Sequence, residues 1–284
     1  MTTTKTNDRP VLVLGGTGKT GRRVAERLRH QGIPVRIGSR ASAVPFDWNE
    51  PTTWPAALSG VRAAYVSYYP DLAVPGAPEA VQALAEAALD HDVRRLVLLS
   101  GRGEVEAQRA EQLVLESGAD ATVVRCAWFM QNFSEAFLRD AVLSGEIALP
   151  GGGAREPWVD ADDIADVAVA ALTEPGHVGE VYELTSPRLY TMEDVAAELG
   201  RAMGRPIRYT PVSVDDYAEA AARQGAPDEL IGFLTYLFSE VFGRNAHTAD
   251  GVPRALGRPA RDLATFAGDA VAAGVWRTPA PTTV

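Results

Sequence analysis

Residues 11–29 hold a change of pattern that limits what the whole chain can fold into. A short apolar run at 11–14 breaks into glycines at Gly15, Gly18 and Gly21, and an amphipathic stretch follows at 22–29. This order predicts a buried strand, a tight turn and then a helix. The chain therefore opens with a strand–turn–helix unit, which is the repeating unit of α/β folds.

The physics of such a turn is anion binding. Glycines let the backbone approach a phosphate, and the first N–H groups of the helix point at it along the positive end of the helix dipole. Their spacing of three and three is a variant of the dinucleotide fingerprint. A nucleoside-triphosphate P-loop is excluded, because Val13 stands where that motif needs its first glycine. A glycine-rich turn that binds nothing is the remaining alternative.

The first half of the chain alternates between apolar runs and helical patterns. This rhythm predicts a doubly wound parallel sheet of the Rossmann type, an α/β fold, with a smaller and mostly helical C-terminal lobe. In this architecture ligands bind at the carboxyl ends of the strands. The predicted strands cover residues 34–37, 63–66, 96–99 and 121–124, and the helical patterns cover 81–90 and 106–117.

After residue 125 the regular alternation of apolar runs and helical patterns ends. We expect a helix over 129–143, a helix that begins near an aspartate at 160 and runs to about 172, and a further strand at 181–184. The predicted division is a disordered tail at 1–9, a dinucleotide-binding core at 10–125 to which 155–186 returns, and a smaller substrate or partner lobe formed by 126–154 and 187–284.

The charge, hydropathy and cysteine content of the chain exclude several classes of protein. The formal net charge of −10 argues against direct nucleic-acid binding. No run of eighteen apolar residues occurs and residues 1–9 are polar, so we expect a cytoplasmic protein without membrane contact. Cys126 is the single cysteine, which excludes an intrachain disulfide, and the absence of a Cys/His cluster gives no metal site.

The end of the second predicted strand indicates which dinucleotide fits. An acidic residue about twenty positions beyond the glycines holds the ribose of NAD, whereas an arginine accommodates the 2′-phosphate of NADP. Here the strand ends in Ser39 and Arg40, and no acidic residue occurs over 35–45. NADP(H) is therefore expected in preference to NAD(H), with Lys19 as a second positive charge near a phosphate.

Several motifs together resemble the NmrA-like family of atypical short-chain dehydrogenases, over roughly residues 10–275. They are Gly-Gly-Thr-Gly-Lys-Thr-Gly at 15–21, Leu-Leu-Ser-Gly at 98–101, Glu111 with Ser-Gly at 117–118, Val-Arg-Cys-Ala-Trp-Phe-Met-Gln-Asn-Phe at 124–133, and Val-Asp-Ala-Asp-Asp-Ile-Ala at 159–165. The resemblance implies an NAD(P)-binding protein of one of two kinds. One kind reduces quinones, azo compounds or related acceptors with NADPH, and the other senses redox state without turnover.

The family's cofactor contacts carry over to residues at three predicted strand ends and in the glycine turn. They are Gly15, Thr17, Gly18, Lys19, Thr20, Gly21, Ser39, Arg40, Ser67, Tyr68 and Ser100. The resemblance also places the Trp128–Phe129 turn beside the nicotinamide. The residues expected to line a substrate pocket are Tyr68, Trp128, Phe129, Asn132 and Trp158. Each of them is equally compatible with a role in the core.

The chain lacks the residues that related enzymes use for proton transfer. Typical short-chain dehydrogenases use a tyrosine as general acid, with a lysine four residues later that lowers its pKa. The only lysines here are Lys5 and Lys19, and neither follows a tyrosine at that spacing. Many NmrA-like proteins carry a lysine four residues before the helix glutamate, where this chain has Ala107. No catalytic acid can therefore be named from the sequence.

Two functions remain open. One is an NAD(P)H-dependent oxidoreductase that transfers hydride to a quinone-like, azo or other small conjugated acceptor. Without a tyrosine–lysine proton relay, its rate enhancement would come from alignment of the nicotinamide with the acceptor. The other is a non-catalytic NADP(H)-binding redox sensor that signals to a protein partner. Isomerisation with a tightly held cofactor is a third option that no lysine supports. The expected partner is a small-molecule acceptor, and a homodimer or a regulatory protein partner is left open.

Overall fold

A computed structural model describes residues 9–136 and 138–277 and divides into two compact units. Unit 1 comprises residues 9–126, 161–184 and 250–259, and unit 2 comprises the remainder. Most of the tail predicted at 1–9 lies outside the described residues. Each unit is built from segments that are distant in the sequence, so neither could fold from one continuous stretch.

Unit 1 is built on a six-stranded sheet in the order β2-β1-β3-β4-β5-β7, in which every pair of neighbours is parallel. All four residues of β1 and all four of β3 are buried. Continuous apolar runs are what strands covered on both faces require. The strands are β1 (Val11–Leu14), β2 (Val35–Gly38), β3 (Ala63–Val66), β4 (Arg95–Gly101), β5 (Asp120–Cys126) and β7 (Val181–Leu184).

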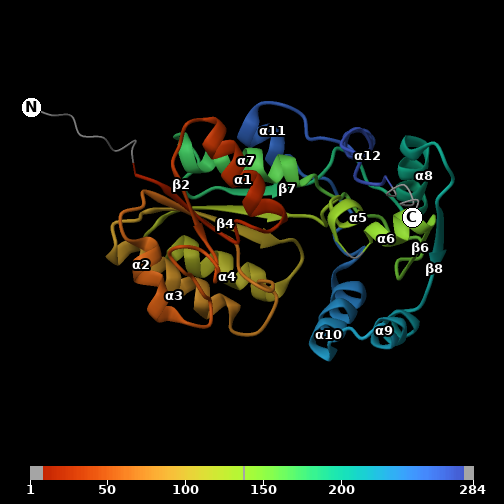
Figure 1. Ribbon diagram of the computed structural model, residues 1–284, viewed down its shortest axis with the longest axis horizontal. Coiled ribbons are helices and arrows are strands. Elements are labelled where there is room, and N and C mark those ends of the chain that lie inside the picture. Colours follow the sequence, from red (N-terminus) through yellow and green to blue (C-terminus); the bar gives the residue numbers. More distant parts are fainter. Residues whose placement is uncertain (1–8, 137, 278–284) are drawn as a thin grey trace, which may run out of the picture. The chain divides into compact units, whose positions relative to one another are not determined.

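Helices cover both faces of this sheet, as Figure 1 shows for unit 1, with α1, α7 and α11 on one face and α2, α3 and α4 on the other. Because a parallel connection must cross over the sheet, the helices are what allow the strands to run in one direction. Their bounds are α1 (Lys19–His30), α2 (Trp54–Leu58), α3 (Ala77–Asp90), α4 (Val105–Glu116), α7 (Ala161–Thr173) and α11 (Gly251–Leu256). The fold class predicted from the βα rhythm is confirmed.

The strand order reverses at β1, which lies between β2 and β3. The chain leaves β1 to one side to form β2 and then crosses to the other side to form β3. Such a switch opens a crevice outside the carboxyl ends of the strands, where ligands of doubly wound sheets bind. In unit 1 this position is bordered by Gly15, which follows β1, and Ser67, which follows β3.

An arginine on α1 fixes that helix against α7. The Arg27 guanidinium donates to Asp162 Oδ1 at 2.6 Å and to Asp166 Oδ1 at 2.5 Å. Arg258 reaches Asp163, which is fully buried, at 2.8 Å. A buried carboxylate needs such a partner, because an unpaired charge in the interior costs several kcal/mol, on the order of 3–5 kcal/mol.

Unit 2 is mainly helical and carries a small parallel sheet of two strands, β6 and β8. Its core includes Phe133, Ile147, Leu199 and Phe266. The elements are α5 (Asn132–Glu135), α6 (Arg139–Ser144), β6 (Glu146–Leu149), α8 (Met192–Met203), β8 (Arg208–Pro211), α9 (Val214–Arg223), α10 (Asp228–Tyr236), a π-helical turn (Leu237–Val241) and α12 (Leu263–Ala272).

Two sequence expectations for unit 2 are wrong. The single helix expected over 129–143 is two short helices, α5 and α6, and α5 ends where Ala136 takes an extended conformation. The strand β8 was not expected at all. Only two of its four residues are even half-buried, so its sequence lacks the apolar run that marks the strands of unit 1. Its pairing with β6, about sixty residues earlier, is a tertiary effect.

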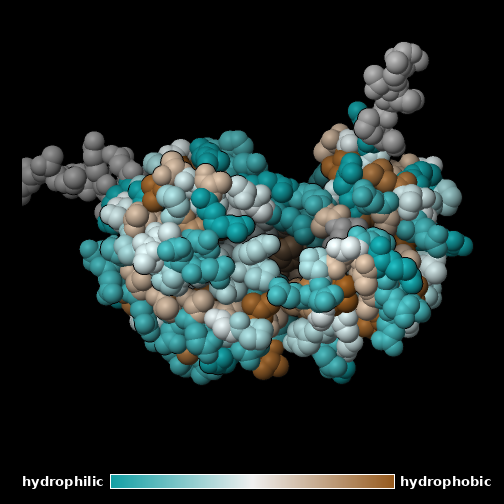
Figure 2. All heavy atoms as spheres, turned by 60° about the horizontal axis from the view of Figure 1, so that its bottom comes forward, coloured by the Kyte–Doolittle hydropathy of each residue, from teal (hydrophilic) through white to brown (hydrophobic). Residues whose placement is uncertain are grey.

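The face drawn in Figure 2 is largely hydrophilic, and its apolar side chains are scattered instead of gathered into one band. The most exposed large apolar residues of the described chain are Tyr69 and Val105, each 73% exposed. None of the helices within residues 9–136 and 138–277 has the length and apolar composition that crossing a membrane needs.

We predict that Leu98→Ala lowers the free energy of unfolding by about 2–5 kcal/mol, because Leu98 is fully buried in β4 and its loss leaves a cavity. Val105→Ala is the control in the same unit, since Val105 is exposed, and it should change the value by less than about 0.5 kcal/mol. Urea titration followed by circular dichroism measures both. Equal effects of the two substitutions would contradict the assigned core.

Candidate functional site

The turn between β1 and α1 closes on itself through its own backbone. Gly15 adopts a φ of 64°, the left-handed region that favours glycine. Its N–H donates to the Gly38 carbonyl at 3.2 Å, and the Gly18 N–H donates back to the Gly15 carbonyl at 2.8 Å. The turn is therefore held by β2 on one side and by α1 on the other.

Close packing explains the third glycine of the motif. A methyl group added at Gly21 would lie 2.3 Å from the Gly15 carbonyl oxygen, which is backbone and cannot swing aside. Helix α1 starts at Lys19 without a side-chain cap and without an acidic residue in its first turn. The positive end of the helix dipole is thus left for an external anion. Thr17 and Gly18 are exposed in this turn, whereas Thr20 is buried.

Ser39 and Arg40 directly follow β2, at the same edge of the sheet as the glycine turn. The Ser39 hydroxyl shares a hydrogen bond of 2.7 Å with that of Ser42. The Arg40 side chain is on the surface. The structure thus places an exposed guanidinium at the carboxyl end of the strand next to β1, which is where the sequence predicts the contact to a 2′-phosphate.

Ser67 and Tyr68 follow β3 on the opposite side of the switch. Ser67 lies against the glycine turn, since a methyl group added at Gly15 would be 3.3 Å from its Oγ. Trp48 holds this segment: its indole N–H donates to the Ser67 carbonyl at 3.3 Å, and its ring lies 4.7 Å from that of Tyr68. Burial raises the pKa of the Tyr68 hydroxyl, so that group stays protonated at neutral pH.

Ser100 lies within a buried polar network and is only 4% exposed. Its hydroxyl donates to Glu111 at 2.6 Å, and Arg125 also donates to Glu111, at 3.0 Å from its Nε. Glu111 is itself 2% exposed. The network joins β4, α4 and β5, and it occupies the Ser100 hydroxyl with an internal partner. Its geometry fits positioning of the sheet edge better than direct contact with a ligand.

Cys126 at the end of β5 is buried, and burial raises the pKa of its thiol well above the usual range. A reactive cysteine needs a thiolate, which this environment disfavours. The side chain therefore behaves as a small apolar group and is not a nucleophile candidate.

The other predicted pocket residues belong to unit 2, where two of them form the centre of an aromatic cluster. The Trp128 ring lies 6.2 Å from that of Trp158 and 5.4 Å from that of Phe238. Phe129 pairs through its backbone with Val159, and Asn132 begins α5. Tyr68 belongs to unit 1, so the structure brings only Trp128 and Trp158 of the predicted pocket into ring contact.

Trp158 is the most constrained residue of this aromatic cluster. It is 1% exposed and has a φ of 27°, a conformation that costs a residue with a side chain about 1–3 kcal/mol. Ser186 holds the strained segment, because its N–H donates to the Trp158 carbonyl at 2.7 Å and its hydroxyl donates to the Pro157 carbonyl at 2.6 Å. The indole N–H of Trp158 is buried without a hydrogen-bond acceptor.

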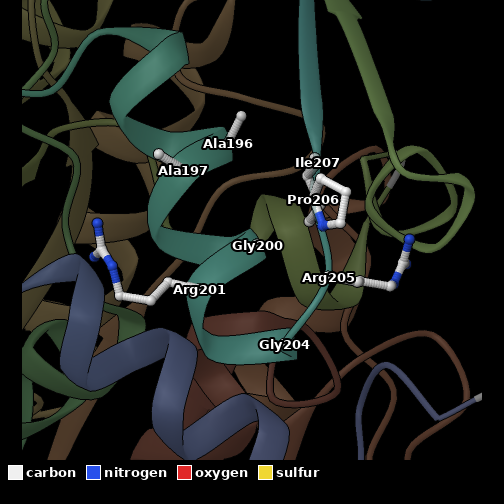
Figure 3. A pocket seen from close by; sticks show the side chains of 8 residues that line it. All are labelled: Ala196, Ala197, Gly200, Arg201, Gly204, Arg205, Pro206 and Ile207. Atoms are coloured by element: carbon white, nitrogen blue, oxygen red, sulfur yellow. The ribbon is translucent and has the colours of Figure 1, made fainter.

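A shallow groove in unit 2 contains none of the predicted residues (Figure 3). Its two arginines, Arg201 and Arg205, point away from one another. Arg201 pairs with Glu198, and Arg205 donates to two carbonyl groups of α6 at 2.8 Å. Both arginines thus have partners within unit 2. It is lined by Ala196, Ala197, Gly200, Arg201, Gly204, Arg205, Pro206 and Ile207.

Two further glycines, which are not among the predicted cofactor contacts, also shape the site. A methyl group at Gly16 would lie 2.6 Å from Ile37 Cδ1, and one at Gly38 would lie 2.4 Å from Leu14 Cδ2. The Gly-Gly doublet and the glycine that ends the second strand were the available signals. In the described residues no group of three or more His, Cys, Asp or Glu side chains could hold a metal ion.

The glycine turn, the switch at β1 and the fold define a class, the NAD(P)H-binding proteins of the Rossmann type. A model of NAD(P)H-binding domains matches residues 15–175. A model of the NmrA-like family matches residues 106–266. The chain belongs to the NmrA-like family, a family of NAD(P)H-binding oxidoreductases, which confirms the resemblance carried by the sequence motifs.

Known proteins similar to this chain span nearly its whole length. An NAD(P)H azoreductase from Xenophilus azovorans is 34% identical, over 90% of this chain and 96% of the azoreductase. An Escherichia coli NADPH-dependent quinone oxidoreductase, solved with NADPH, has a TM-score of 0.75 at 23% identity and covers 91% of this chain and 99% of its own. NmrA, a negative transcriptional regulator solved with NAD, has a TM-score of 0.68 at 16% identity, with 95% and 100% covered.

We predict that Gly21→Ala weakens binding of NADPH at least about tenfold, a loss of about 1.4 kcal/mol, because the added methyl group collides with the Gly15 carbonyl and opens the turn. Gly268→Ala is the matched control, since Gly268 is also helical and its added methyl group would meet no neighbouring atom within 4 Å. Fluorescence titration with NADPH measures both. Unchanged affinity in Gly21→Ala would place the cofactor elsewhere.

Proposed function

We propose that this protein is an NADPH-dependent reductase that transfers hydride to a quinone-like, azo or other small conjugated acceptor. The observation that carries the proposal is the 34% identity to an NAD(P)H azoreductase over 90% of the chain. The glycine turn at the switch point supports it, because this turn offers backbone N–H groups and an uncapped helix end to a pyrophosphate.

The preference for NADPH follows from the end of β2. Arg40 is exposed there, and residues 35–45 contain no carboxylate that could accept hydrogen bonds from an adenosine ribose. A guanidinium recognises a phosphate with two parallel hydrogen bonds, whereas the ribose hydroxyl of NADH offers it no charge. Lys19 at the start of α1 supplies a second positive charge for the phosphates.

The proposed reaction proceeds without the usual tyrosine and lysine. The reduced nicotinamide supplies a hydride when the cofactor is bound. The protein's own contribution is then to bind and orient the reactants, and alignment alone can account for a large part of a rate enhancement. In this proposal Trp128, Phe129, Asn132 and Trp158 of unit 2 contribute to the acceptor pocket, and their aromatic rings suit a flat conjugated molecule.

Turnover distinguishes the reductase from a sensor. We expect the protein to oxidise NADPH in the presence of at least one quinone or azo dye and to be inactive with simple carbonyl compounds, which need a proton donor. Loss of NADPH absorbance with a panel of acceptors measures this. Tight NADPH binding without oxidation by any acceptor would overturn the reductase and leave an NADPH-responsive sensor.

The cofactor preference has its own test. Arg40→Ala should weaken NADPH binding by about tenfold or more, as expected for loss of a charged hydrogen bond worth about 1.5–3 kcal/mol, and should leave NADH binding unchanged. Arg29→Ala, which removes an exposed arginine at the far end of α1, is the control. Isothermal titration calorimetry with NADPH and with NADH gives the dissociation constants of the unmodified protein and of both variants. Tighter binding of NADH than NADPH by the unmodified protein would exclude the assignment.

A further inference from the structure

Two acidic side chains of unit 1 meet at the edge of the sheet where β3 and β4 end. Asp71 lies in the loop that follows β3, and Glu104 directly precedes α4. Their carboxyl groups are within hydrogen-bond reach of one another. Glu104 is only 7% exposed, and its Oε2 is fully buried with no donor from any other described group.

Glu104 is buried and Asp71 is half-buried. Contact between their carboxyl groups disfavours ionisation of both, because two negative charges repel and neither carboxylate can donate a hydrogen bond. Burial is the largest cause that raises the pKa of Glu104, to about 8, followed by the charge of Asp71 and then that of Glu111. Burial also raises the pKa of Asp71. No cation is among the groups that shift the pKa of Glu104, since Arg125 on β5 is bound to Glu111 and Arg102 is bound to Glu183.

The position of the Glu104 carboxyl group is fixed by the chain around it. A methyl group added at Gly101 would lie 2.1 Å from Glu104 Oε2 and 2.5 Å from its Cδ, so the carboxyl group packs directly on the glycine backbone. On the other side, Asp71 Oδ1 accepts the Ala73 N–H at 3.0 Å. Both acids are therefore held in place, and their contact joins the β3–α3 loop to the start of α4.

We propose that Asp71 and Glu104 share one proton, and that this Asp71–Glu104 bridge acts as a pH-dependent clamp that positions the loop carrying Ser67 and Tyr68 at the cofactor edge. The proposal rests on the cofactor site proposed above. The loop begins at Ser67, which lies against Gly15 of the glycine turn, and the bridge ties it at Asp71, near its middle. Loss of the shared proton separates the two carboxylates and frees the loop.

The shared proton can be measured without any cofactor. Infrared difference spectra should show the C=O band of a protonated carboxyl group at neutral pH, which disappears above about pH 8 and is absent from Glu104→Gln. The free energy of unfolding should fall as the pH rises from the ordinary glutamate value to about 8, since the folded state alone holds the proton in that window. This slope should be smaller in Glu104→Gln. A fully ionised pair at neutral pH would overturn the bridge.

Binding of NADPH tests the clamp. If only the bridged form binds, the dissociation constant of the unmodified protein should rise about tenfold between about pH 7 and about pH 9, following the fraction of bridged molecules. Glu104→Gln should keep its affinity over this range, because the amide donates permanently to Asp71. Asp71→Asn offers the same rescue from the other side if Glu104→Gln fails to fold. Glu106→Gln, on the surface of α4, is the matched control and should follow the unmodified protein.

The possible failures are distinguishable. Suppose that infrared spectroscopy shows the shared proton, but NADPH affinity depends on pH as strongly in Glu104→Gln as in the unmodified protein. That result would overturn the clamp and leave the proposed function intact. Absence of NADPH binding at every pH would instead remove the proposed function, and the infrared and unfolding measurements would still decide whether the bridge exists.

Discussion

The close approach of two glycines in the β1–α1 turn is the constraint on which unit 1 depends. Because Gly21 packs on the Gly15 carbonyl, α1 can start within a few residues of β1 and lie back over the sheet. That placement brings Arg27 to the carboxylates of α7 and leaves the helix N-terminus at the edge where the strand order reverses. Any side chain at position 21 would collide with the Gly15 backbone and push α1 away from β1, which would weaken the contact of α1 with α7 and disturb the proposed cofactor turn.

The carboxyl edge of the sheet collects the polar residues of unit 1 because all its strands run in one direction. Ser39 and Arg40 follow β2, Ser67 follows β3, and Glu104 lies just beyond β4. These groups differ in how much of each side chain is exposed to solvent. Arg40 is exposed, whereas Glu104 is buried and packs on the Gly101 backbone. Under the two proposals, recognition by Arg40 and positioning by Glu104 are therefore separated along one edge of the sheet.

Features with a local cause could be predicted from the sequence. The strands of unit 1 are apolar runs and the glycine turn is a short motif, so fold class and family followed from them. The break between α5 and α6 and the pairing of β8 with β6 could not be predicted, since β8 is largely exposed and its partner lies about sixty residues away. The contact of Asp71 with Glu104 gave no signal either, because only the sheet brings their two loops together. Trp128 and Trp158 are in ring contact, and their predicted role in a substrate pocket stays a prediction.

The chain has no lysine beyond position 19, and this limits which side chains can take part in proton transfer. A lysine lowers the pKa of a catalytic tyrosine through its charge, but here burial raises the pKa of Tyr68 and nothing cationic opposes it. In the proposed Asp71–Glu104 bridge, burial and mutual repulsion instead keep one proton on a carboxyl pair near neutral pH. The proposed reductase therefore favours an acceptor that stabilises its own negative charge after hydride addition, since the chain offers no tyrosine–lysine pair to protonate it. Quinones and azo compounds meet that condition through conjugation, whereas isolated carbonyl compounds do not.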